Sequence, residues 1–312
     1  PAVAGGRAVL SDDITRYVDL HRELGFKFRL QECLLRHFAR FAEPRGDDFV
    51  RSSTAIAWAK EAPSPEQRRE RLAFVRRFAR RMHAEDDRYE VPPARVFGRP
   101  TRRRRVPHIY TPDEIRRLLE AASRLGPKGS GRAETYVTLV ALLASTGLRI
   151  SEALALQLGD ITADGLVVRN TKFRKSRLVP LHPTARAGLE RYLALRVRRC
   201  VEDTSLFLSL WDKGMSYPRV NAVFLELMRS VGLRGEPGTP GPCMHDLRHT
   251  VAVRALEAAE GDGEDIARHI LALSTYLGHA HPSDTYWYLQ ATPKLMAGIS
   301  DAAERFFSGA GS

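Results

Sequence analysis

Four short segments of the chain carry residue types that suit chemistry on a phosphate group. The first, 146–152, reads Thr-Gly-Leu-Arg-Ile-Ser-Glu and predicts a tight turn followed by the start of a helix. The second lies in a predicted strand-turn-strand segment, the third is His-Asp-Leu-Arg-His at 245–249, and the fourth is Leu-Gly-His at 277–279 with a tyrosine nine positions later. The side chains of interest are Arg149, Lys172, His245, Arg248, His279 and Tyr288.

These residue types fit an attack on a phosphodiester. The phosphate is an anion, and its transition state places further charge on the non-bridging oxygens, to which the guanidinium groups of Arg149 and Arg248 can donate paired hydrogen bonds. Tyr288 can act as a covalent nucleophile. A phosphotyrosyl link conserves the bond energy, so that no nucleotide cofactor is required. The sequence has no Walker loop or metal-ligand motif beside these residues.

The choice of nucleophile has rivals in the sequence. Tyr276 and Tyr286 lie close to Tyr288, and a core or surface tyrosine is the commoner case. The residue types alone do not choose among the three tyrosines. In the third segment His249 follows the arginine directly, and we interpret it as a structural residue.

Taken in order, the four segments resemble the signature of the tyrosine recombinase family, also called the phage integrases, over about residues 111–288. That signature has an arginine in a TGLR-type turn with an acidic residue three positions on, here Glu152. A β-hairpin lysine, a HxxR pair, a histidine in LGH and a tyrosine nine residues later complete it. Lys172 matches the hairpin lysine better than its rival Lys175. Each motif alone arises by chance, whereas the ordered set is specific.

The resemblance implies a site-specific DNA recombinase or integrase, from a mobile element, that works through a 3′-phosphotyrosyl intermediate without metal or ATP. In such an enzyme His245 and His279 add hydrogen-bond donors to the phosphate, and Lys172 protonates the departing 5′-oxygen. Glu152 orients its neighbours. Two other functions stay open: a monomeric type IB topoisomerase-like enzyme, and a DNA-binding accessory protein that has lost catalysis.

The composition favours a polyanionic partner. The 312 residues include 49 Lys and Arg against 37 Asp and Glu, which gives a formal net charge of +12 and a pI near 10.0. Such an excess suits double-stranded DNA or an anionic membrane surface, although an arginine-rich composition also arises without such a partner. We expect a cytoplasmic protein that binds DNA and no membrane, because the sequence lacks a long apolar run, a secretory signal and a CxxC pair.

Residues 1–90 predict a helical domain, which the resemblance identifies as a core-binding, DNA-binding domain. We expect a first helix capped by Asp12 or Asp13 and closed by Gly25, a second around apolar positions 34, 38 and 41, and a third beginning at Ser53.

A fourth helix in this domain is predicted by Ser64 as N-cap, Pro65 in the first turn and Gln67 completing a capping box. Its non-apolar surface is mostly arginine, and such a density of like charge favours contact with DNA phosphates over a solvated face. Proline, glycine and arginine in residues 91–108 predict an extended basic interdomain linker. The residues expected to bind DNA are Arg68, Arg69, Arg76, Arg80, Arg102, Arg103, Arg104 and Arg105.

Residues 109–312 predict an α+β catalytic domain, so that the whole chain is mainly α. A capping box at Thr111 and Glu114 opens it, and alternating apolar residues within 160–181 predict two or three antiparallel strands. Apolar residues at helical spacing after Pro293 predict a C-terminal tail helix. In the family that it resembles, such a helix docks on a neighbouring protomer, so we expect a tetramer on DNA.

Overall fold

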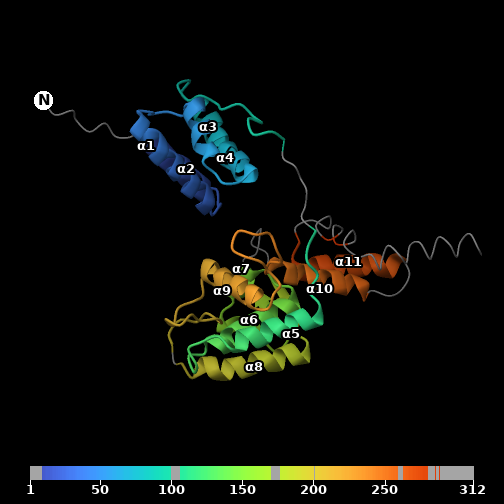
Figure 1. Cartoon of the computed structure of the whole chain (residues 1–312). Coiled ribbons are helices and arrows are strands. Elements are labelled where there is room, and N and C mark those ends of the chain that lie inside the picture. The colour runs from blue at the N-terminus through green and yellow to red at the C-terminus, as the bar shows by residue number, and fades with distance from the viewer. Residues whose placement is uncertain are drawn as a thin grey trace, which may run out of the picture. The chain divides into compact units, whose positions relative to one another are not determined.

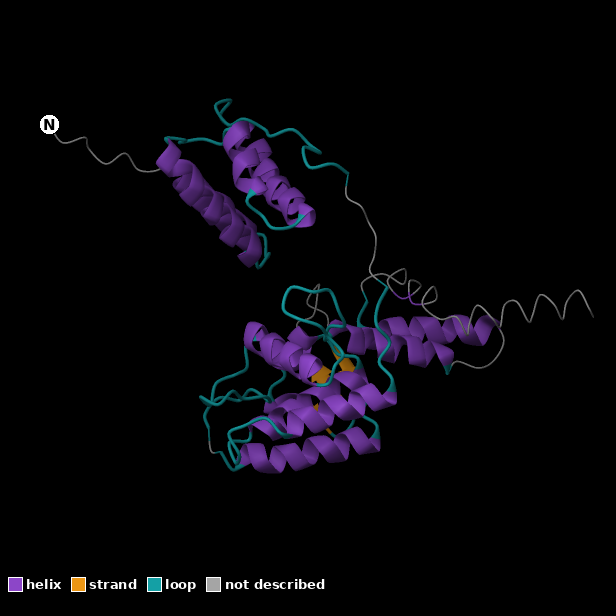
Figure 2. Ribbon diagram, in the orientation of Figure 1, coloured by secondary structure: helices purple, strands orange, loops and turns teal. Residues whose placement is uncertain are grey.

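Two compact units, residues 1–104 and 105–312, make up the chain. Both are built mainly from helices (Figures 1 and 2). Their division falls inside the segment 91–108 that the sequence predicts as a linker. The computed structural model describes residues 9–99, 106–169, 176–199, 201–258 and 263–279, together with residues 285 and 288.

Helices of the first unit pack their apolar faces into one core. Trp58, Phe38 and Phe78 are its largest fully buried side chains apart from Tyr89, and they come from three different helices. Its described elements are α1 (Val9–Glu23), α2 (Arg29–Ala42), the short 3₁₀ helix η1 (Glu43–Arg45), α3 (Ser52–Lys60) and α4 (Pro65–His83).

The start of the first helix differs from the sequence prediction. Helix α1 is already formed at Val9, so neither Asp12 nor Asp13 is its N-cap. The reason lies in packing: Leu10 is fully buried, so the apolar stripe of the helix begins earlier than the predicted cap. Asp13 lies within the helix, where it accepts a hydrogen bond from the buried hydroxyl of Tyr89.

Other predicted helix ends agree with the structure. Gly25 follows α1 with a positive φ of 85°, and Ser64 is the N-cap of α4, where its hydroxyl accepts the backbone N–H of Gln67 at 3.2 Å. Helix α3 begins at Ser52, one residue before the predicted start.

Helix α6 (Arg132–Thr146) is the centre of the second unit. It is buried on several sides and packs against α5, α8 and α10 (Figure 1), as expected for a helix that is apolar around much of its circumference. The helices around it are α5 (Pro112–Ser123), α7 (Ile150–Ala155), the 3₁₀ helix η2 (Leu158–Asp160), α8 (Pro183–Val197), α9 (Tyr217–Ser230), α10 (His245–Glu257) and α11 (Gly263–Leu277).

A three-stranded antiparallel sheet in the order β1-β2-β3 completes this unit and confirms the predicted sheet (Figure 2). Leu166 pairs with Val179, and both are buried. Gly165 is required at the start of the second strand, because a Cβ there would lie 2.3 Å from the carbonyl oxygen of Val179. The strands are β1 (Ile161–Thr162), β2 (Gly165–Val168) and β3 (Arg177–Val179).

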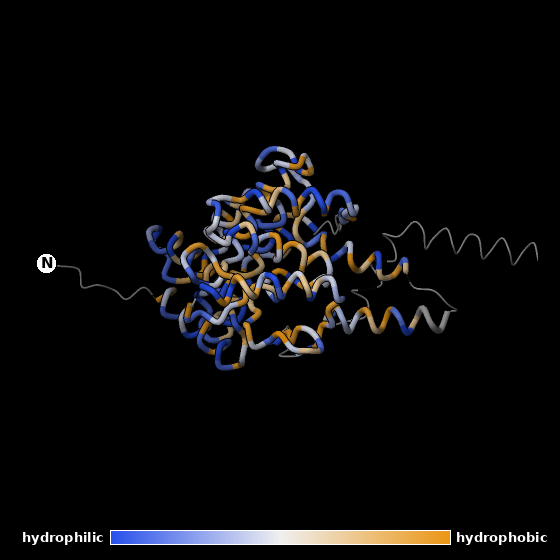
Figure 3. Tube along the Cα trace, turned by 90° about the horizontal axis from the view of Figure 1, so that it is seen from below, coloured by the Kyte–Doolittle hydropathy of each residue, from blue (hydrophilic) through white to orange (hydrophobic). Residues whose placement is uncertain are grey.

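Hydrophobic and hydrophilic residues alternate in short stretches along the helices (Figure 3), as amphipathic helices require. Among the described residues, no helix is long and apolar enough to span a bilayer. The predicted tail helix after Pro293 lies outside the described residues.

Candidate functional site

The turn between α6 and α7 directs the guanidinium of Arg149. Gly147 ends α6 with a positive φ of 63°, and Arg149 is the N-cap of α7. Glu152 accepts the backbone N–H of Arg149 at 3.0 Å and its Nη1 at 2.9 Å, while Nη2 donates to the carbonyl of Gly278 at 3.1 Å. The predicted turn and helix start are therefore confirmed.

Arg248 lies beside this turn, on the first turn of α10, and only 2% of its surface is exposed. Its Nη1 donates to the carbonyl of Gly147 at 2.8 Å, and its Nη2 donates to that of Leu277 at 2.6 Å. Burial, and then the charge of Arg149, lower the pKa of Arg248 to about 10. Arg248 is thus still a cation at neutral pH, and two neighbouring guanidiniums favour an anion at this place.

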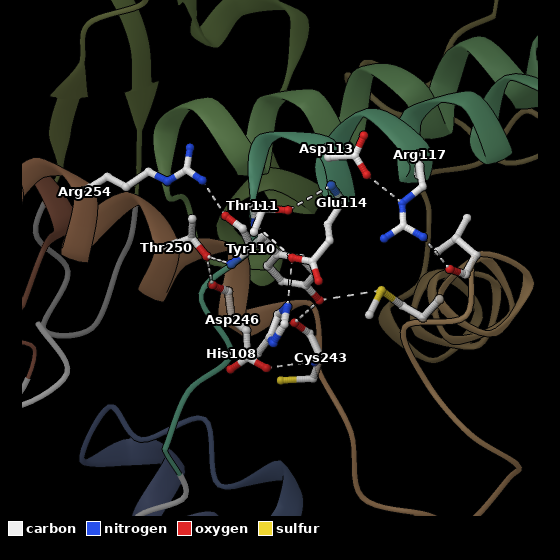
Figure 4. Close-up of polar contacts among 12 residues, drawn as sticks. His108, Tyr110, Thr111, Asp113, Glu114, Arg117, Cys243, Asp246, Thr250 and Arg254 are labelled. Atoms are coloured by element: carbon white, nitrogen blue, oxygen red, sulfur yellow. Dashed lines mark hydrogen bonds and ion pairs between the residues drawn. The ribbon is translucent and has the colours of Figure 1, made fainter. Parts of the chain in front are cut away.

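Helix α10 is held by the chain that enters the second unit (Figure 4). The backbone N–H of Tyr110 donates to Thr250 Oγ1 at 2.9 Å, and its hydroxyl donates to the carbonyl of Cys243 at 3.1 Å. Asp246 accepts the N–H of Cys243 at 2.8 Å, and Arg254 donates to the carbonyl of Tyr110 at 2.5 Å. These bonds fix the first turns of α10, from which the third sequence segment projects.

The segment before α5 is closed by the predicted capping box. Thr111 Oγ1 accepts the N–H of Glu114 at 3.2 Å, and Glu114 accepts the N–H of Thr111 at 2.8 Å. His108 lies 3.1 Å from the same carboxylate (Figure 4). This part of the sequence prediction is confirmed.

Tyr288 is buried, with 3% of its surface exposed, in a cluster with apolar residues of α10 and α11. Its ring centroid lies 6.0 Å from that of His279, nearly parallel, and 5.3 Å from that of His249. His279 Nδ1 is hydrogen-bonded to Thr285 Oγ1 at 2.7 Å. An ionised Tyr288 would raise the pKa of Arg248, against the lowering by burial and by Arg149.

His245 begins α10 and stacks edge-on against His249, with ring centroids 4.7 Å apart. Burial, and then the charge of Arg248, lower the pKa of His245. Its imidazole is therefore neutral at pH 7. His249, which the sequence favours as structural, lies between His245 and Tyr288 as a packing partner of both.

Some sequence-predicted residues fall outside the described part of the chain. Lys172 and its rival Lys175 lie within 170–175, and Tyr286 is also not described. Tyr276 is half-buried on α11.

Arg177 is a member of this cluster that the sequence prediction missed. It begins β3, and its Nη1 and Nη2 donate to the two carboxylate oxygens of Glu152 at 3.1 and 2.8 Å. Strand alternation offers a signal for it, because Arg177 falls on the same face as Val179, which is buried, while Leu178 on the other face is 45% exposed. Such a reversal of the usual pattern indicates a buried ion pair.

The carboxylate of Glu152 is buried together with these cations. Burial alone would raise its pKa, but the hydrogen bonds and charge of Arg177, followed by those of Arg149, outweigh burial and lower the pKa of Glu152 below its usual value. Glu152 is therefore ionised at neutral pH and holds both guanidiniums.

The arginines of α4 also have partners inside their own unit. Arg68, Arg69 and Arg76 are half-buried and donate to the backbone carbonyls of residues 62, 97 and 92 at 2.8, 3.3 and 2.7 Å. Two of these bonds hold the segment after α4 against the helix. Arg80 is exposed, and the predicted DNA-binding run 102–105 lies outside the described residues.

Comparisons with known proteins show which family the chain belongs to. Residues 109–294 match the model of the phage integrase family. The putative integrase/recombinase y4rB of Sinorhizobium fredii (strain NBRC 101917 / NGR234) is 38% identical over 304 residues, which cover 94% of this chain and 96% of that protein. Tyrosine recombinase XerD of Caulobacter vibrioides is 33% identical over 243 residues, covering 76% of this chain and 74% of XerD.

The fold is similar to that of a lambda integrase tetramer solved in complex with a Holliday junction. The TM-score is 0.60 at 18% sequence identity, and the match covers 88% of this chain and 78% of the integrase chain.

Proposed function

The chain belongs to the phage integrase family, and from that premise we propose that it is a site-specific recombinase that cleaves and rejoins DNA through Tyr288. The observation that carries the proposal is that two guanidiniums donate to adjacent backbone carbonyls, at residues 277 and 278. Arg248 donates to the carbonyls of Gly147 and Leu277, and Arg149 donates to that of Gly278. Tyr288 packs on the histidine that follows this stretch.

This arrangement suits one backbone phosphate of DNA. Arg149 and Arg248 supply positive charge and N–H donors for its non-bridging oxygens, and their charges are fixed before the reaction begins. His245 is neutral at pH 7 and supplies a further N–H donor, as does His279. A bound phosphate would also relieve the repulsion between the two guanidiniums, which favours binding of the anion.

The reaction is an exchange of one ester for another. The phenol oxygen of Tyr288 attacks phosphorus and releases its proton to water. A P–O bond to tyrosine forms, and the bond to the 5′-oxygen breaks. Lys172 donates a proton to that leaving oxygen. Because one P–O bond replaces another, a later attack by a DNA hydroxyl reverses the step without a nucleotide cofactor.

A DNA substrate with a nick near the cleavage site tests this function, because the short 5′-hydroxyl strand diffuses away and traps the intermediate. We expect a covalent protein-DNA complex that depends on a specific sequence and, for strand exchange, on paired inverted sites. Covalent attachment to DNA of any sequence, together with relaxation of supercoiled DNA by the monomeric protein, would instead show a topoisomerase-like enzyme. Absence of the complex on the cognate site would show an inactive DNA-binding protein.

We also propose that the recombinase acts as a tetramer, in the cytoplasm, and belongs to a mobile element. Apolar residues at helical spacing between Leu295 and Phe307 support an intersubunit helix. The lambda integrase bound to a Holliday junction is itself a tetramer. Sedimentation of the complex on paired sites should give four copies, and two copies would contradict the tetramer.

DNA affinity should fall steeply with salt if the arginines of α4 and of the linker contact phosphates. Each such contact contributes about 0.9 to the slope of log affinity against log salt. Arg80 is exposed, while Arg68, Arg69 and Arg76 bind carbonyls of their own unit. Arg80→Gln should therefore make the salt dependence of affinity less steep by about 0.9. Arg36→Gln, which removes an ion pair with Glu32 on α2, serves as control. An unchanged slope for Arg80→Gln would remove that residue from the interface.

A further inference from the structure

Arg177 stands at the base of the hairpin formed by β2 and β3. It is the first residue of β3, five positions after Lys172 in the sequence. Its side chain is 11% exposed and is turned toward Glu152. An arginine with so little contact with water is held by specific partners, and each of these partners belongs to another part of the site.

Arg177 and Arg149 both donate to the carboxylate of Glu152, and each carboxylate oxygen accepts one hydrogen bond from each arginine. Carboxylate oxygen Oε1 accepts Nη1 of Arg149 and Nη1 of Arg177, at 2.9 and 3.1 Å. Oxygen Oε2 accepts the backbone N–H of Arg149 and Nη2 of Arg177, at 3.0 and 2.8 Å. Each oxygen therefore joins the two arginines, and a displacement of Arg177 changes the support of Arg149.

A second connection runs from Arg177 to the end of α11. Its Nε donates to the carbonyl of Tyr276 at 2.8 Å. Gly278, with a positive φ of 66°, leaves no space beside it, since an added Cβ would lie 2.6 Å from Nη1 of Arg177. The next residue is His279, so the guanidinium packs against the turn that presents this histidine.

We propose that Arg177 is a positioning residue that fixes the two segments supplying Arg149 and His279 relative to one another. The inference rests on the proposed function. Arg177 acts through Glu152 and through the turn at Gly278, without contact to the phosphate.

The ionisation of Glu152 gives this role a measurable signature. The charged groups acting on Glu152 are Arg177 of β3, Arg149 of its own helix start and, at longer range, Arg248 of α10. Without Arg177, the effect of burial on the pKa of Glu152 is no longer outweighed to the same extent, so this pKa rises. A protonated Glu152 is a weaker acceptor for the hydrogen bonds from Arg149, so the phosphate site loses its alignment as the pH falls.

The test measures single-turnover cleavage of the nicked substrate, together with DNA affinity, for wild type, Arg177→Gln and Arg177→Lys. We expect Arg177→Gln to cleave about 10²-fold more slowly at neutral pH, with DNA affinity within about threefold of wild type. The rate ratio of variant to wild type should fall further as the pH is lowered, because the pKa of Glu152 is higher in the variant. Arg177→Lys, which retains a charge, should recover part of the rate.

Two controls separate positioning from general damage. In the Glu152→Gln background, position 152 no longer titrates, so adding Arg177→Gln should lower the rate by a factor that does not vary with pH. Arg186→Gln removes another arginine that supports the same sheet, through the carbonyls of Thr162 and Ala163. Because the described bonds of Arg186 do not involve Glu152, the cleavage rate of Arg186→Gln should stay close to that of wild type at every pH.

The outcomes distinguish this inference from the proposed function. If wild type forms no covalent complex, the proposed function itself is wrong. The positioning role is wrong, while the proposed function stands, if wild type and Arg177→Gln cleave equally fast. The same conclusion follows if the loss of cleavage rate in Arg177→Gln is independent of pH and also occurs in Arg186→Gln. Should Arg177→Gln not fold, the cleavage rate of Arg177→Lys decides: a rate below that of wild type is expected, and a rate equal to that of wild type would overturn the proposal.

Discussion

Tyr288→Phe should abolish the covalent protein-DNA complex and lower strand cleavage by at least about 10⁴-fold. The substitution removes one oxygen atom, and phenylalanine has no nucleophile to replace it. The ring is 3% exposed and packs against His249 and His279. Because phenylalanine preserves this packing, folding and DNA affinity should stay close to those of wild type. The measurement is covalent capture on the nicked substrate, with affinity measured in parallel.

Tyr276→Phe is the matched control for this prediction. Tyr276 is half-buried nearby, and it is the backbone carbonyl, not the hydroxyl, that accepts the bond from Arg177. Its hydroxyl should therefore be dispensable for cleavage. Retention of the covalent complex by Tyr288→Phe, together with its loss in Tyr276→Phe or Tyr286→Phe, would move the nucleophile to another tyrosine.

Arg248→Gln should lower cleavage by at least about 10³-fold, because it removes a fixed cation and its donors from the phosphate site. Its effect on stability should be small by comparison. The lowered pKa of Arg248, about 10, means that the folded state disfavours the cation at any pH below that value, by about 3 kcal/mol. Loss of the donors to the carbonyls of Gly147 and Leu277 costs about 1–3 kcal/mol for each carbonyl. These effects oppose each other, so the free energy of unfolding should change by no more than about 3 kcal/mol.

Arg196→Gln is the control for this comparison. Arg196, on the last turn of α8, is also 2% exposed, and it donates to the carbonyls of Asp203 and Ser205 in the segment that follows this helix. We expect it to lower the melting temperature while the cleavage rate per folded molecule stays within about threefold of wild type. If Arg248→Gln cleaves as fast as Arg196→Gln, Arg248 does not contact the reacting phosphate.

DNA itself should discriminate between the two variants. A bound phosphate offsets the buried charge of Arg248, so the cognate duplex should raise the melting temperature of wild type more than that of Arg248→Gln. The rise for Arg196→Gln should equal that of wild type.

Local features of the fold could be predicted from the sequence because short-range chemistry determines them. The capping box of Thr111 and Glu114 and the turn at Gly147 depend on residues within a few positions of one another. The same holds for the hairpin at Gly165. The start of α1 could not be predicted in this way, because burial of Leu10 by the rest of the unit overrides the caps at Asp12 and Asp13.

The contacts that build the site are long-range, and the sequence alone does not reveal them. Arg248 and its acceptor Gly147 are 101 positions apart, and Arg177 is 25 positions from Glu152. The sequence motifs predict a set of site residues, and that set stays a prediction. That Arg248 is held by backbone carbonyls, and that Arg177 shares Glu152 with Arg149, follows only from the fold.

Mass spectrometry of the peptide that remains attached to DNA tests the central claim most directly. After capture on the nicked substrate, nuclease and protease digestion should leave a nucleotide linked through phosphate to Tyr288. Attachment to Tyr276, Tyr286 or a residue other than tyrosine would contradict the account, whatever the rates of the variants.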